Sequence, residues 1–361
     1  AADGYGRMAD KPALTLLHLG SGFANSMANL HNARRAHVPL VNMVGDHATY
    51  HLKYDAPLTS DVMAYCELGS NWVGRSESAD NLAEVGAAAV QAAMQGNGQI
   101  ASFIAPANHA WEPGSKPAAA LPLTAPEKVA DAAIERAALA LQSGGPSALF
   151  LGGRALRAEA LTLAGRIAQA SGARLICETF PARLQRGTGR VRVDRLPYFS
   201  EQAMDALKDF RQMVMVGSKP PVSFFAYPGK PGWLLPETCQ HQTLAAYDQD
   251  IFDALTRLAE RLGASTDGLT VEPVSGIAAP DGLLTPQSIG QSITRHLPAG
   301  AIVSDEAATC GLGIYACTEQ AAAHDWLTLT GGAIGQGLPL ALGAAIACPQ
   351  RKVVALQADG S

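Results

Sequence analysis

The sequence predicts an α/β protein that is built from three successive domains, each with a parallel sheet. Short apolar runs alternate with helix-compatible stretches along the whole chain, which is the rhythm of βα units. Two segments rich in Pro, Ala, Gly or Ser interrupt this rhythm and divide the chain. The three predicted domains cover residues 1–112, 126–262 and 286–361.

Composition narrows the class of protein further. The 361 residues are 48% hydrophobic and 16% charged, which is ordinary for α/β proteins with buried cores. The formal net charge of −5 argues against a nucleic-acid partner. Six cysteines without CxxC spacing argue against a zinc site or a disulfide framework and favour a reducing cytoplasm. No apolar run approaches a membrane span, so no membrane partner is expected.

In the first block, the runs ALTLLHL, VPLVNMVG and QIASFIAP predict strands, and residues 80–94 predict a helix. A Pro/Ala-rich linker follows at residues 112–128. The second block repeats the pattern with SALFLGG, a helix over residues 157–170, ARLICETF and MVMVG. After a loop region at residues 263–286, the third block has a helix over residues 287–296, the strand AIVSDE, a glycine-rich segment and a final strand.

The final strand runs into Asp359, Gly360 and Ser361. A carboxylate, a glycine and a hydroxyl at the end of a buried strand can offer a metal ligand and backbone N–H groups to a diphosphate. Asp359 could instead cap a following helix, but the metal role is favoured by its position. We expect the chain to be an internal piece of a longer enzyme, which by itself would show no activity.

Two further features carry candidate site residues. The segment Gly331 to Gly337 is glycine-rich, but its spacing is not that of a dinucleotide loop, and close helix packing is an alternative reading. His18 ends a predicted strand just before an expected turn at residues 20–22. An isolated histidine at such a place is more often a hydrogen-bonded core group, but a titratable imidazole also suits proton transfer.

Several of these segments together resemble the thiamine diphosphate (ThDP) enzymes of the acetolactate synthase and benzoylformate decarboxylase type. The opening AADGYGRMADKPALTLLHLGSGFANSMANLHNARRAHVPLV is similar to the N-terminal core of that family. The close of the chain is similar to its G-x-G-x-x-L-P-x-A-x-G-A helix and G-D-G-S turn. The resemblance implies a pyrimidine-binding domain truncated at its N-terminus, a middle Rossmann-like domain, and a diphosphate-binding domain truncated at its C-terminus.

The resemblance also assigns roles to residues in the third block. Asp359 would be a Mg²⁺ ligand in a turn with Gly360 and Ser361, although Ala358 replaces the family's first glycine. The Gly332 carbonyl would accept a hydrogen bond from the cofactor's 4′-amino group. Ile334 would be the bulky apolar residue beneath the thiazolium ring.

Other assigned residues have structural alternatives. Thr309 would place its hydroxyl on the diphosphate, or it is an ordinary turn residue. Glu306 would take part in cofactor binding, or it is a structural acid at a strand end. In the first domain, Gly22 and Asn25 would belong to the cofactor-binding turn. His18 matches the histidine that benzoylformate decarboxylases use for proton transfer, where acetolactate synthases carry a small hydroxyl residue.

The implied function is a ThDP- and Mg²⁺-dependent decarboxylase or carboligase that acts on a 2-oxo acid. The implied assembly is a homodimer or homotetramer, because domains of different subunits meet at one cofactor in this family. The catalytic glutamate and the second Mg²⁺ ligand are expected outside the chain. Asp46 and His47 also follow a strand, and their role stays open.

The middle block leads to a second hypothesis. Its strand, glycine turn, helix and strand, with Glu178 at the second strand's end, loosely match a nucleotide-binding unit. Acetolactate synthases hold FAD in this domain, but their R-F-D-D-R run is replaced by residues 218–229, so FAD is not expected. The same loop has Phe224-Phe225-Ala226 where benzoylformate decarboxylases carry a histidine. The alternative function is a non-catalytic nucleotide-binding or subunit-interaction protein.

Overall fold

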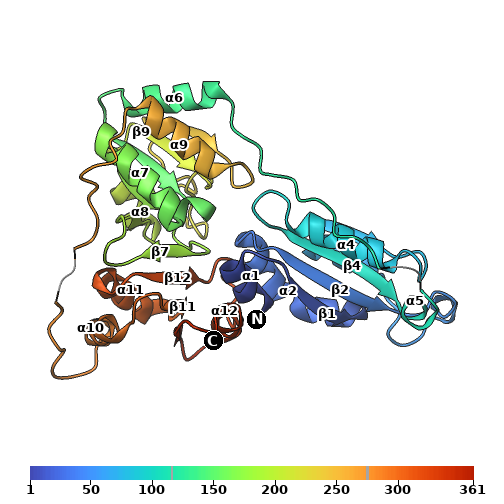
Figure 1. Cartoon of the computed structure of the whole chain (residues 1–361). Coiled ribbons are helices and arrows are strands. Elements are labelled where there is room, and N and C mark those ends of the chain that lie inside the picture. The colour runs from blue at the N-terminus through green and yellow to red at the C-terminus, as the bar shows by residue number, and fades with distance from the viewer. Residues whose placement is uncertain (115–116, 274–275) are drawn as a thin grey trace. The chain divides into compact units, whose positions relative to one another are not determined.

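The computed structural model describes residues 1–114, 117–273 and 276–361 (Figure 1). The chain divides into two compact units. Unit 1 contains residues 1–125, 304–306 and 329–361, and unit 2 contains residues 126–303 and 307–328. The third predicted block is thus shared between the two units, and each unit is described separately. The predicted domain boundaries themselves stay a prediction.

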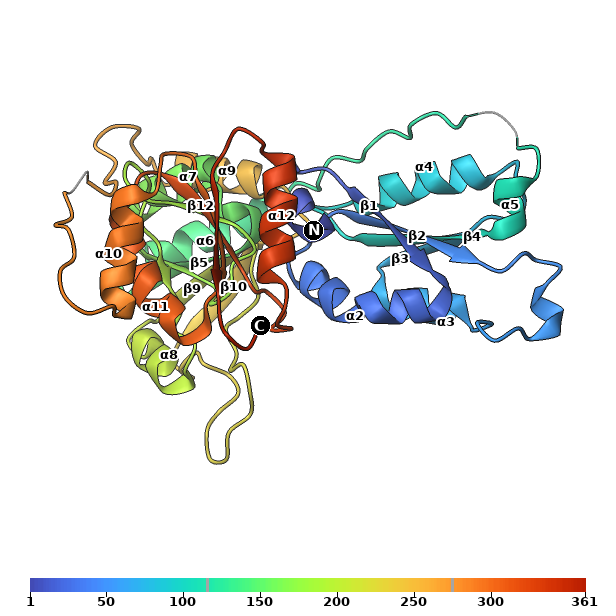
Figure 2. The ribbon, with the colours of Figure 1, turned by 90° about the horizontal axis from the view of Figure 1, so that it is seen from below.

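Unit 1 contains a four-stranded parallel sheet in the order β1-β2-β4-β3. Its strands are β1 (Ala13–His18), β2 (Leu40–Asp46), β3 (Trp72–Arg75) and β4 (Ile100–Pro106). Figure 2 shows α2 (Leu19–Arg35) and α3 (Val62–Gly69) on one side of the sheet and α4 (Leu82–Ala93) on the other. The 3₁₀ helix η1 (Leu52–Tyr54) and the short α5 (Ala107–Trp111) complete this part.

A row of polar side chains crosses the middle of this sheet. The Thr15 hydroxyl donates to Asn42 Oδ1 at 2.6 Å, and Asn42 Nδ2 donates to the Ser102 hydroxyl at 2.9 Å. The Ser102 hydroxyl also bonds the Ser70 hydroxyl at 2.6 Å. Each buried polar group therefore has a partner, and a one-residue slip of any strand would break the row.

The remaining elements of unit 1 are α1 (Ala2–Ala9), α12 (Gly337–Ala347) and β13 (Val353–Gln357). α1 and α12 pack directly on each other, and the contact depends on two glycines. A Cβ at Gly4 would lie 1.9 Å from the Leu340 carbonyl oxygen, and one at Gly343 would lie 1.8 Å from the Ala1 carbonyl oxygen. Only glycine permits so close an approach of the two backbones.

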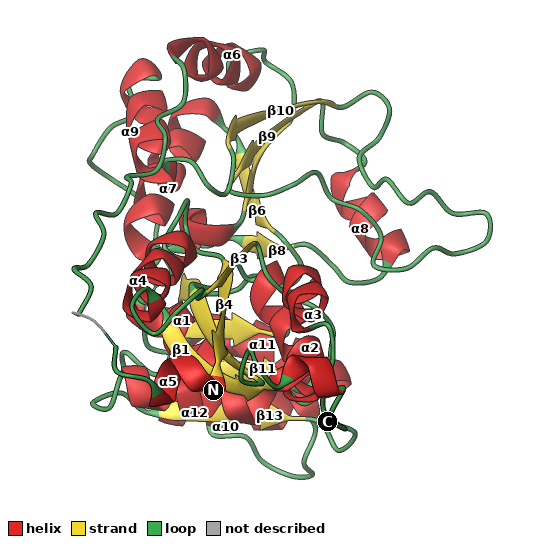
Figure 3. Cartoon of the chain, turned by 90° about the vertical axis from the view of Figure 1, so that its right-hand side faces the viewer, coloured by secondary structure: helices red, strands yellow, loops and turns green. Residues whose placement is uncertain are grey.

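Unit 2 contains a five-stranded parallel sheet in the order β10-β9-β5-β6-β8. The strands are β5 (Ser147–Leu151), β6 (Arg174–Cys177), β8 (Asp194–Arg195), β9 (Gln212–Val216) and β10 (Gln240–Ala245). Figure 3 shows the helices α6 (Asp131–Leu141), α7 (Ala158–Ser171) and α9 (Ile251–Arg261) on one side and α8 (Ser200–Leu207) on the other. The 3₁₀ helix η2 (Gly153–Leu156) follows β5.

Further elements of unit 2 are α10 (Pro286–His296), α11 (Ala308–Cys317), the 3₁₀ helix η3 (Thr318–Gln320) and β12 (His324–Thr328). β11 (Ile302–Glu306) contributes residues to both units. β12 pairs with β7 (Leu184–Arg186), and this pairing is antiparallel. The predicted α/β class with parallel sheets is confirmed, and this antiparallel pair adds to it. The sequence pattern did not predict it because β7 is only three residues long.

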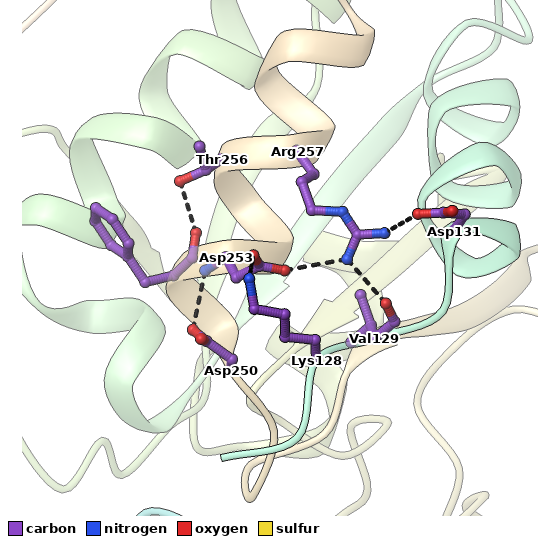
Figure 4. Close-up of polar contacts among 8 residues, drawn as sticks. Lys128, Val129, Asp131, Asp250, Asp253, Thr256 and Arg257 are labelled. Atoms are coloured by element: carbon purple, nitrogen blue, oxygen red, sulfur yellow. Dashed lines mark hydrogen bonds and ion pairs between the residues drawn. The ribbon is translucent and has the colours of Figure 1, made fainter. Parts of the chain in front are cut away.

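A surface network joins the start of unit 2 to α9 (Figure 4). Lys128 Nζ lies 2.7 Å from Asp253, and Arg257 pairs with both Asp253 and Asp131. The hydrogen bond from Lys128 is the main cause that lowers the pKa of Asp253. Lys128 and Asp131 are exposed, whereas Asp253 and Arg257 are mostly covered, so the network lies at the surface and orients α9 against α6. Among the described residues, no helix is both long and apolar enough to cross a membrane.

Replacing Gly343 with Ala should destabilise unit 1, because the added methyl group would collide with the backbone of α1. We expect a loss of at least about 1–3 kcal/mol, the usual range for overpacking. The control is Gly86→Ala in α4, where a Cβ would meet only Phe103 Cζ at 3.9 Å. That change should be neutral or stabilising, since alanine favours a helix. Thermal melts of the three proteins compare these effects, and equal melting temperatures would contradict the close crossing.

Candidate functional site

The glycine-rich segment of unit 1 lies just before α12. Gly332 has φ 76° and Gly335 has φ 91°, in the left-handed region where side chains other than hydrogen are disfavoured. At Gly331 the constraint is space, because a Cβ there would lie 2.4 Å from Asn32 Oδ1. The glycines therefore shape a backbone turn, as the position of the segment between a strand and a helix requires.

The end of α2 holds this segment in place. Asn32 is fully buried; its Nδ2 donates to the Ala333 carbonyl at 2.7 Å, and its Oδ1 accepts from the Ala333 N–H at 3.2 Å. His31 Nε2 lies 3.1 Å from the Gly331 carbonyl oxygen. The Thr330 hydroxyl donates to the Asn32 carbonyl at 2.7 Å. These bonds on both sides of Gly332 fix the orientation of its peptide groups.

Glu306 fixes the other end of the segment. It is buried at the end of β11, and its carboxylate accepts hydrogen bonds from the Gly335 N–H at 2.5 Å and from the Gly337 N–H. The first N–H groups of a helix have no partner inside the helix, and the positive end of the helix dipole favours a negative charge there. Glu306 thus holds the start of α12, and its predicted part in cofactor binding stays a prediction.

Between these two anchors, one apolar side chain is exposed. Ile334 has 66% of its surface accessible, although it is flanked by fixed backbone. Its neighbour Gln336 is instead buried and donates to Asp3, which also pairs with Arg7. The Oε1 atom of Gln336 is buried and has no hydrogen-bond partner within the described residues. The segment therefore presents an apolar side chain outward from a rigid polar base.

Asp359, Gly360 and Ser361 follow β13, close to the end of β11. The Ala358 N–H donates to the Glu306 carbonyl at 3.2 Å, and the Ser361 N–H donates to the Ala358 carbonyl at 3.3 Å. All three residues are exposed, so the Asp359 carboxylate is open to a cation. Within residues 1–114, 117–273 and 276–361, no three His, Cys, Asp or Glu side chains gather closely enough to hold a metal ion by themselves. To bind a metal ion, Asp359 would need further oxygen ligands from other groups.

His18 lies at the end of β1 and is exposed. The expected turn at residues 20–22 is wrong, because α2 begins at Leu19 and these residues form its first turn. The chain reverses at Leu19, which has φ 58°. Gly20 is needed for a close approach, since a Cβ there would lie 2.4 Å from the Ser60 hydroxyl.

Gly22 and Asn25 also belong to α2. A Cβ at Gly22 would lie 3.4 Å from the Cβ of His18, which is an ordinary van der Waals distance. Asn25 is exposed one turn further along the helix. Asp46, at the end of β2, pairs with Arg75 at 2.9 Å and accepts from the His47 N–H at 2.7 Å. The His47 Nε2 atom is buried and has no hydrogen-bond partner among the described residues.

The two parts of the candidate site lie at opposite ends of α2. His18 precedes the first residue of the helix, and Asn32, which binds Ala333, lies near its last. An α-helix rises 1.5 Å per residue, so the two ends are separated by about 20 Å. The sequence motifs did not reveal this separation, because it depends on which end of α2 contacts the glycine-rich segment.

Thr309 belongs to unit 2, where it is exposed in the first turn of α11. The preceding Ala308 has φ 45°, so the chain turns sharply as α11 begins. Because Thr309 and the glycine-rich segment lie in different units, the structure does not test whether they share a ligand. The sequence motifs did not identify Asn32, Gln336 or Arg75, because each of these side chains acts through contacts with residues that are distant in the chain.

The sheet of unit 2 carries Glu178 at the end of β6. β5 lies between β6 and β9, and the strand ends at such a point are where α/β sheets bind ligands. The Glu178 carboxyl accepts a hydrogen bond from the Gly153 N–H and lies 3.1 Å from where a Cβ of Gly152 would be. Burial raises the pKa of Glu178 to about 7. A diphosphate would have to displace this carboxyl to reach the same N–H group.

Comparisons with known proteins relate the chain to one family. The model for the thiamine pyrophosphate enzyme N-terminal TPP binding domain matches residues 1–65. A protein of Mycobacterium tuberculosis H37Rv, assigned as an acetolactate synthase large subunit (IlvX), is 48% identical over 364 residues. That alignment covers 100% of this chain and 69% of the other protein.

Three solved structures share the fold. A ThDP-dependent 4-hydroxybenzoylformate decarboxylase of Rhodococcus jostii RHA1 matches with TM-score 0.84 and 21% identity, over 99% of this chain and 71% of that one. An enzyme of Mycobacterium smegmatis, assigned as thiamin diphosphate-dependent, has TM-score 0.82 and 23% identity over 99% and 73%. A benzoylformate decarboxylase of Polynucleobacter necessarius has TM-score 0.78 and 18% identity over 99% and 71%.

Replacing Glu306 with Gln should loosen the glycine-rich segment. The amide keeps one acceptor oxygen but turns an NH₂ group toward the second backbone N–H, which then stays unpaired at a cost of about 1–3 kcal/mol. Hydrogen exchange of a peptide covering residues 331–340 should become faster, and the peptide over α4 should not change. Glu67→Gln, at an exposed position of α3, is the control. Unchanged exchange in Glu306→Gln would show that the carboxylate does not hold the helix start.

Proposed function

Since this chain belongs to the thiamine diphosphate enzymes, we propose that it is a ThDP- and Mg²⁺-dependent decarboxylase or carboligase of a 2-oxo acid. The observation that carries the proposal is the geometry of the glycine-rich segment. Ile334 is held outward by Glu306 on one side and Asn32 on the other, with left-handed glycines at positions 332 and 335. An exposed isoleucine on so rigid a base suits contact with an apolar ring of a cofactor.

The residues present fit the cofactor. Ile334 would support the thiazolium ring, and the Gly332 carbonyl, whose flanking peptides are fixed by Asn32 and His31, would accept from the aminopyrimidine. The unpaired Gln336 Oε1 marks a further polar atom beside this segment. When bound, ThDP supplies a carbon nucleophile and an electron sink for the loss of carbon dioxide. The protein's part is to position the rings and to exclude water.

Asp359 would hold a Mg²⁺ ion, whose positive charge would favour binding of a diphosphate. Mg²⁺ is usually held by one or two carboxylates together with phosphate oxygens and water. An exposed carboxylate in a tight turn at a strand end meets this requirement, and the N–H groups of Gly360 and Ser361 lie beside it. The remaining ligands of the Mg²⁺ ion would be groups other than the residues that the structure places around this carboxylate.

His18 would transfer protons to and from the substrate. It is exposed at the end of β1. An imidazole changes charge near neutral pH, so it can donate a proton to the carbon that carried the carboxylate. A histidine here favours release of an aldehyde, as in decarboxylases. The loop with Phe224 and Phe225 lacks the histidine that benzoylformate decarboxylases carry there. The proposal therefore also includes a carboligase reaction, in which the decarboxylated group is transferred to a second carbonyl compound.

The length of α2 supports a site shared between two copies of the chain. His18 and the segment around Ile334 lie about 20 Å apart along α2, which is too far for both to touch one reacting carbon atom. Two copies related by a twofold axis can bring the His18 of one copy to the segment of the other. The proposed assembly is therefore a homodimer, or a homotetramer built from two such dimers.

The middle domain does not favour the alternative function, which is that of a non-catalytic nucleotide-binding or subunit-interaction protein. The Glu178 carboxyl occupies the N–H group that a bound diphosphate would need, so the residues do not fit FAD or another dinucleotide. We therefore propose that FAD is not a cofactor of this enzyme. A cytoplasmic location is also proposed, and all six cysteines being free thiols supports it.

Replacing Asp359 with Ala should abolish the Mg²⁺ dependence of ThDP binding. Loss of the carboxylate removes a metal ligand, so we expect the Kd for ThDP at saturating Mg²⁺ to rise by more than about 100-fold. Calorimetric titration with and without Mg²⁺ measures this. Asp281→Ala, which removes an exposed carboxylate from a loop of unit 2, should bind as the parent protein does. If the affinity for ThDP depends on Mg²⁺ equally in both variants, Asp359 is a helix cap and not a metal ligand.

Replacing His18 with Ala should slow turnover of the enzyme by roughly 10²–10⁴-fold with little change in cofactor affinity. Co-expression with Asp359→Ala then tests the shared site. If sites are shared, each mixed dimer has one intact site, and random pairing restores about a quarter of the parent activity. If each site lies within one copy, every site keeps one defect and nothing is restored. Unchanged turnover of His18→Ala alone would assign the imidazole a structural role.

A further inference from the structure

The imidazole of His47 has a buried nitrogen that the fold does not use. His47 directly follows β2, and its Nε2 atom is buried without a hydrogen-bond partner in the described part of the chain. The neighbouring carboxylate does not supply one, because Asp46 accepts from the His47 backbone N–H and pairs with Arg75. Buried polar atoms in proteins nearly always have a hydrogen-bond partner, so this exception requires a cause. A role as a hydrogen-bonded core group does not explain His47.

The loop that follows β2 carries further buried polar atoms of this kind. The hydroxyl oxygens of Thr59 and Ser60, just before α3, are also buried without a hydrogen-bond partner among the described residues. A Cβ at Gly20 would lie 2.4 Å from Ser60 Oγ, so this hydroxyl lies against the first turn of α2. His18 directly precedes that helix. The Ser60 hydroxyl is therefore close to the place where His18 is exposed.

His47 lies at the same edge of the sheet as His18. β1 and β2 are parallel neighbours, and His18 lies opposite Gly45, two residues before His47. Neighbouring strands are about 4.8 Å apart and two residues span at most about 7 Å, so the two histidine Cα atoms lie within about 12 Å. Ligands of α/β sheets bind outside the carboxyl ends of parallel strands. His18, His47 and Ser60 can thus reach one small molecule at this edge.

We propose that His47 Nε2 and the Ser60 hydroxyl bind the carboxylate of the 2-oxo acid substrate, beside the His18 that transfers protons. The inference rests on the proposed function and names the residues that recognise the charged end of the substrate. An ionised carboxylate only accepts hydrogen bonds, so it pairs with the Ser60 O–H and with the N–H of the imidazole. Hydrogen bonds to an ionised acceptor are the stronger kind. Substrate binding supplies both side chains with the partner that the fold does not give them.

The loop between these two residues controls access to them. Both polar atoms are covered in the structure, so the substrate reaches them when the connecting loop, residues 48–59, moves aside. Several side chains of this loop are exposed, among them Tyr50 and Tyr54. The turn at its start is held by the Asp46 carboxylate. The loop can therefore move while the backbone of His47 stays in place.

The unpaired nitrogen also predicts an effect on stability that separates this role from a structural one. A buried polar group without a partner destabilises the folded chain. His47→Phe keeps an aromatic ring of similar size, 5.5 Å from the His51 ring, and removes the unpaired nitrogen. We expect its melting temperature to rise while its affinity for the carboxylate falls. Replacing a histidine that only stabilises the fold would lower the melting temperature and leave the affinity unchanged.

The binding test uses oxamate, an unreactive acid shaped like a small 2-oxo acid, and oxamide as its uncharged counterpart. Calorimetric titrations of the enzyme are made with and without ThDP and Mg²⁺. The Kd for oxamate should rise at least about tenfold in His47→Phe and in Ser60→Ala, the loss expected for a hydrogen bond to a charged group. His47→Gln keeps an N–H donor and should stay within about threefold of the parent. The control is His241→Phe, at an exposed position of β10, which should bind oxamate as the parent does.

Each outcome decides the proposal. It would be overturned by an enzyme that does not bind oxamate, by equal affinity for oxamide, by unchanged affinity in His47→Phe or Ser60→Ala, or by a lower melting temperature of His47→Phe. If His47→Phe does not fold, the imidazole NMR signals of His47 in the parent protein decide instead. Oxamate should shift them and oxamide should not, and unshifted signals would overturn the proposal. ThDP titration of Asp359→Ala tests the proposed function separately, because it does not depend on oxamate.

Discussion

The candidate site depends on a buried carboxylate that holds the start of a helix. Glu306 accepts hydrogen bonds from the N–H groups of Gly335 and Gly337, and these groups would otherwise be unpaired donors at the beginning of α12. With the start of α12 fixed, Ile334 points outward from a rigid turn. Gly343 is likewise placed where α1 can cross the helix at close range. The glycine-rich turn, α12 and the crossing of α12 with α1 therefore all depend on Glu306.

The second constraint is the length of α2, which acts as a spacer. One end of this helix carries His18, and the other end binds Ala333 through both atoms of the Asn32 amide group. Because the helix is stiff, the two groups cannot approach one another within one copy. The same stiffness fixes each of them accurately for a partner. The proposed sharing of the site between two copies rests on this one dimension.

In unit 2, a buried carboxyl occupies a backbone N–H group at the end of a parallel sheet. Its strand order places the ends of β5 and β9 where α/β sheets bind nucleotides. The Glu178 carboxyl takes the Gly153 N–H, and burial keeps the pKa of this group near 7. The unit also carries surface networks, such as the ion pairs of Arg257.

The sequence by itself determined the class of fold and most elements, because apolar runs and helical periodicity are local properties that act over a few residues. The strands ending at His18 and before Asp359 were predicted within a residue or two for this reason. Whether the predicted site residues bind a cofactor stays a prediction. Only the tertiary structure decided that Leu19 reverses the chain, that Asn32 anchors the glycine-rich segment, and that Glu306 caps α12. Each of these depends on groups that are distant in the chain or on a single backbone angle. The same is true of the buried His47 Nε2 atom, because only the folded chain shows that no polar group of the described residues meets it.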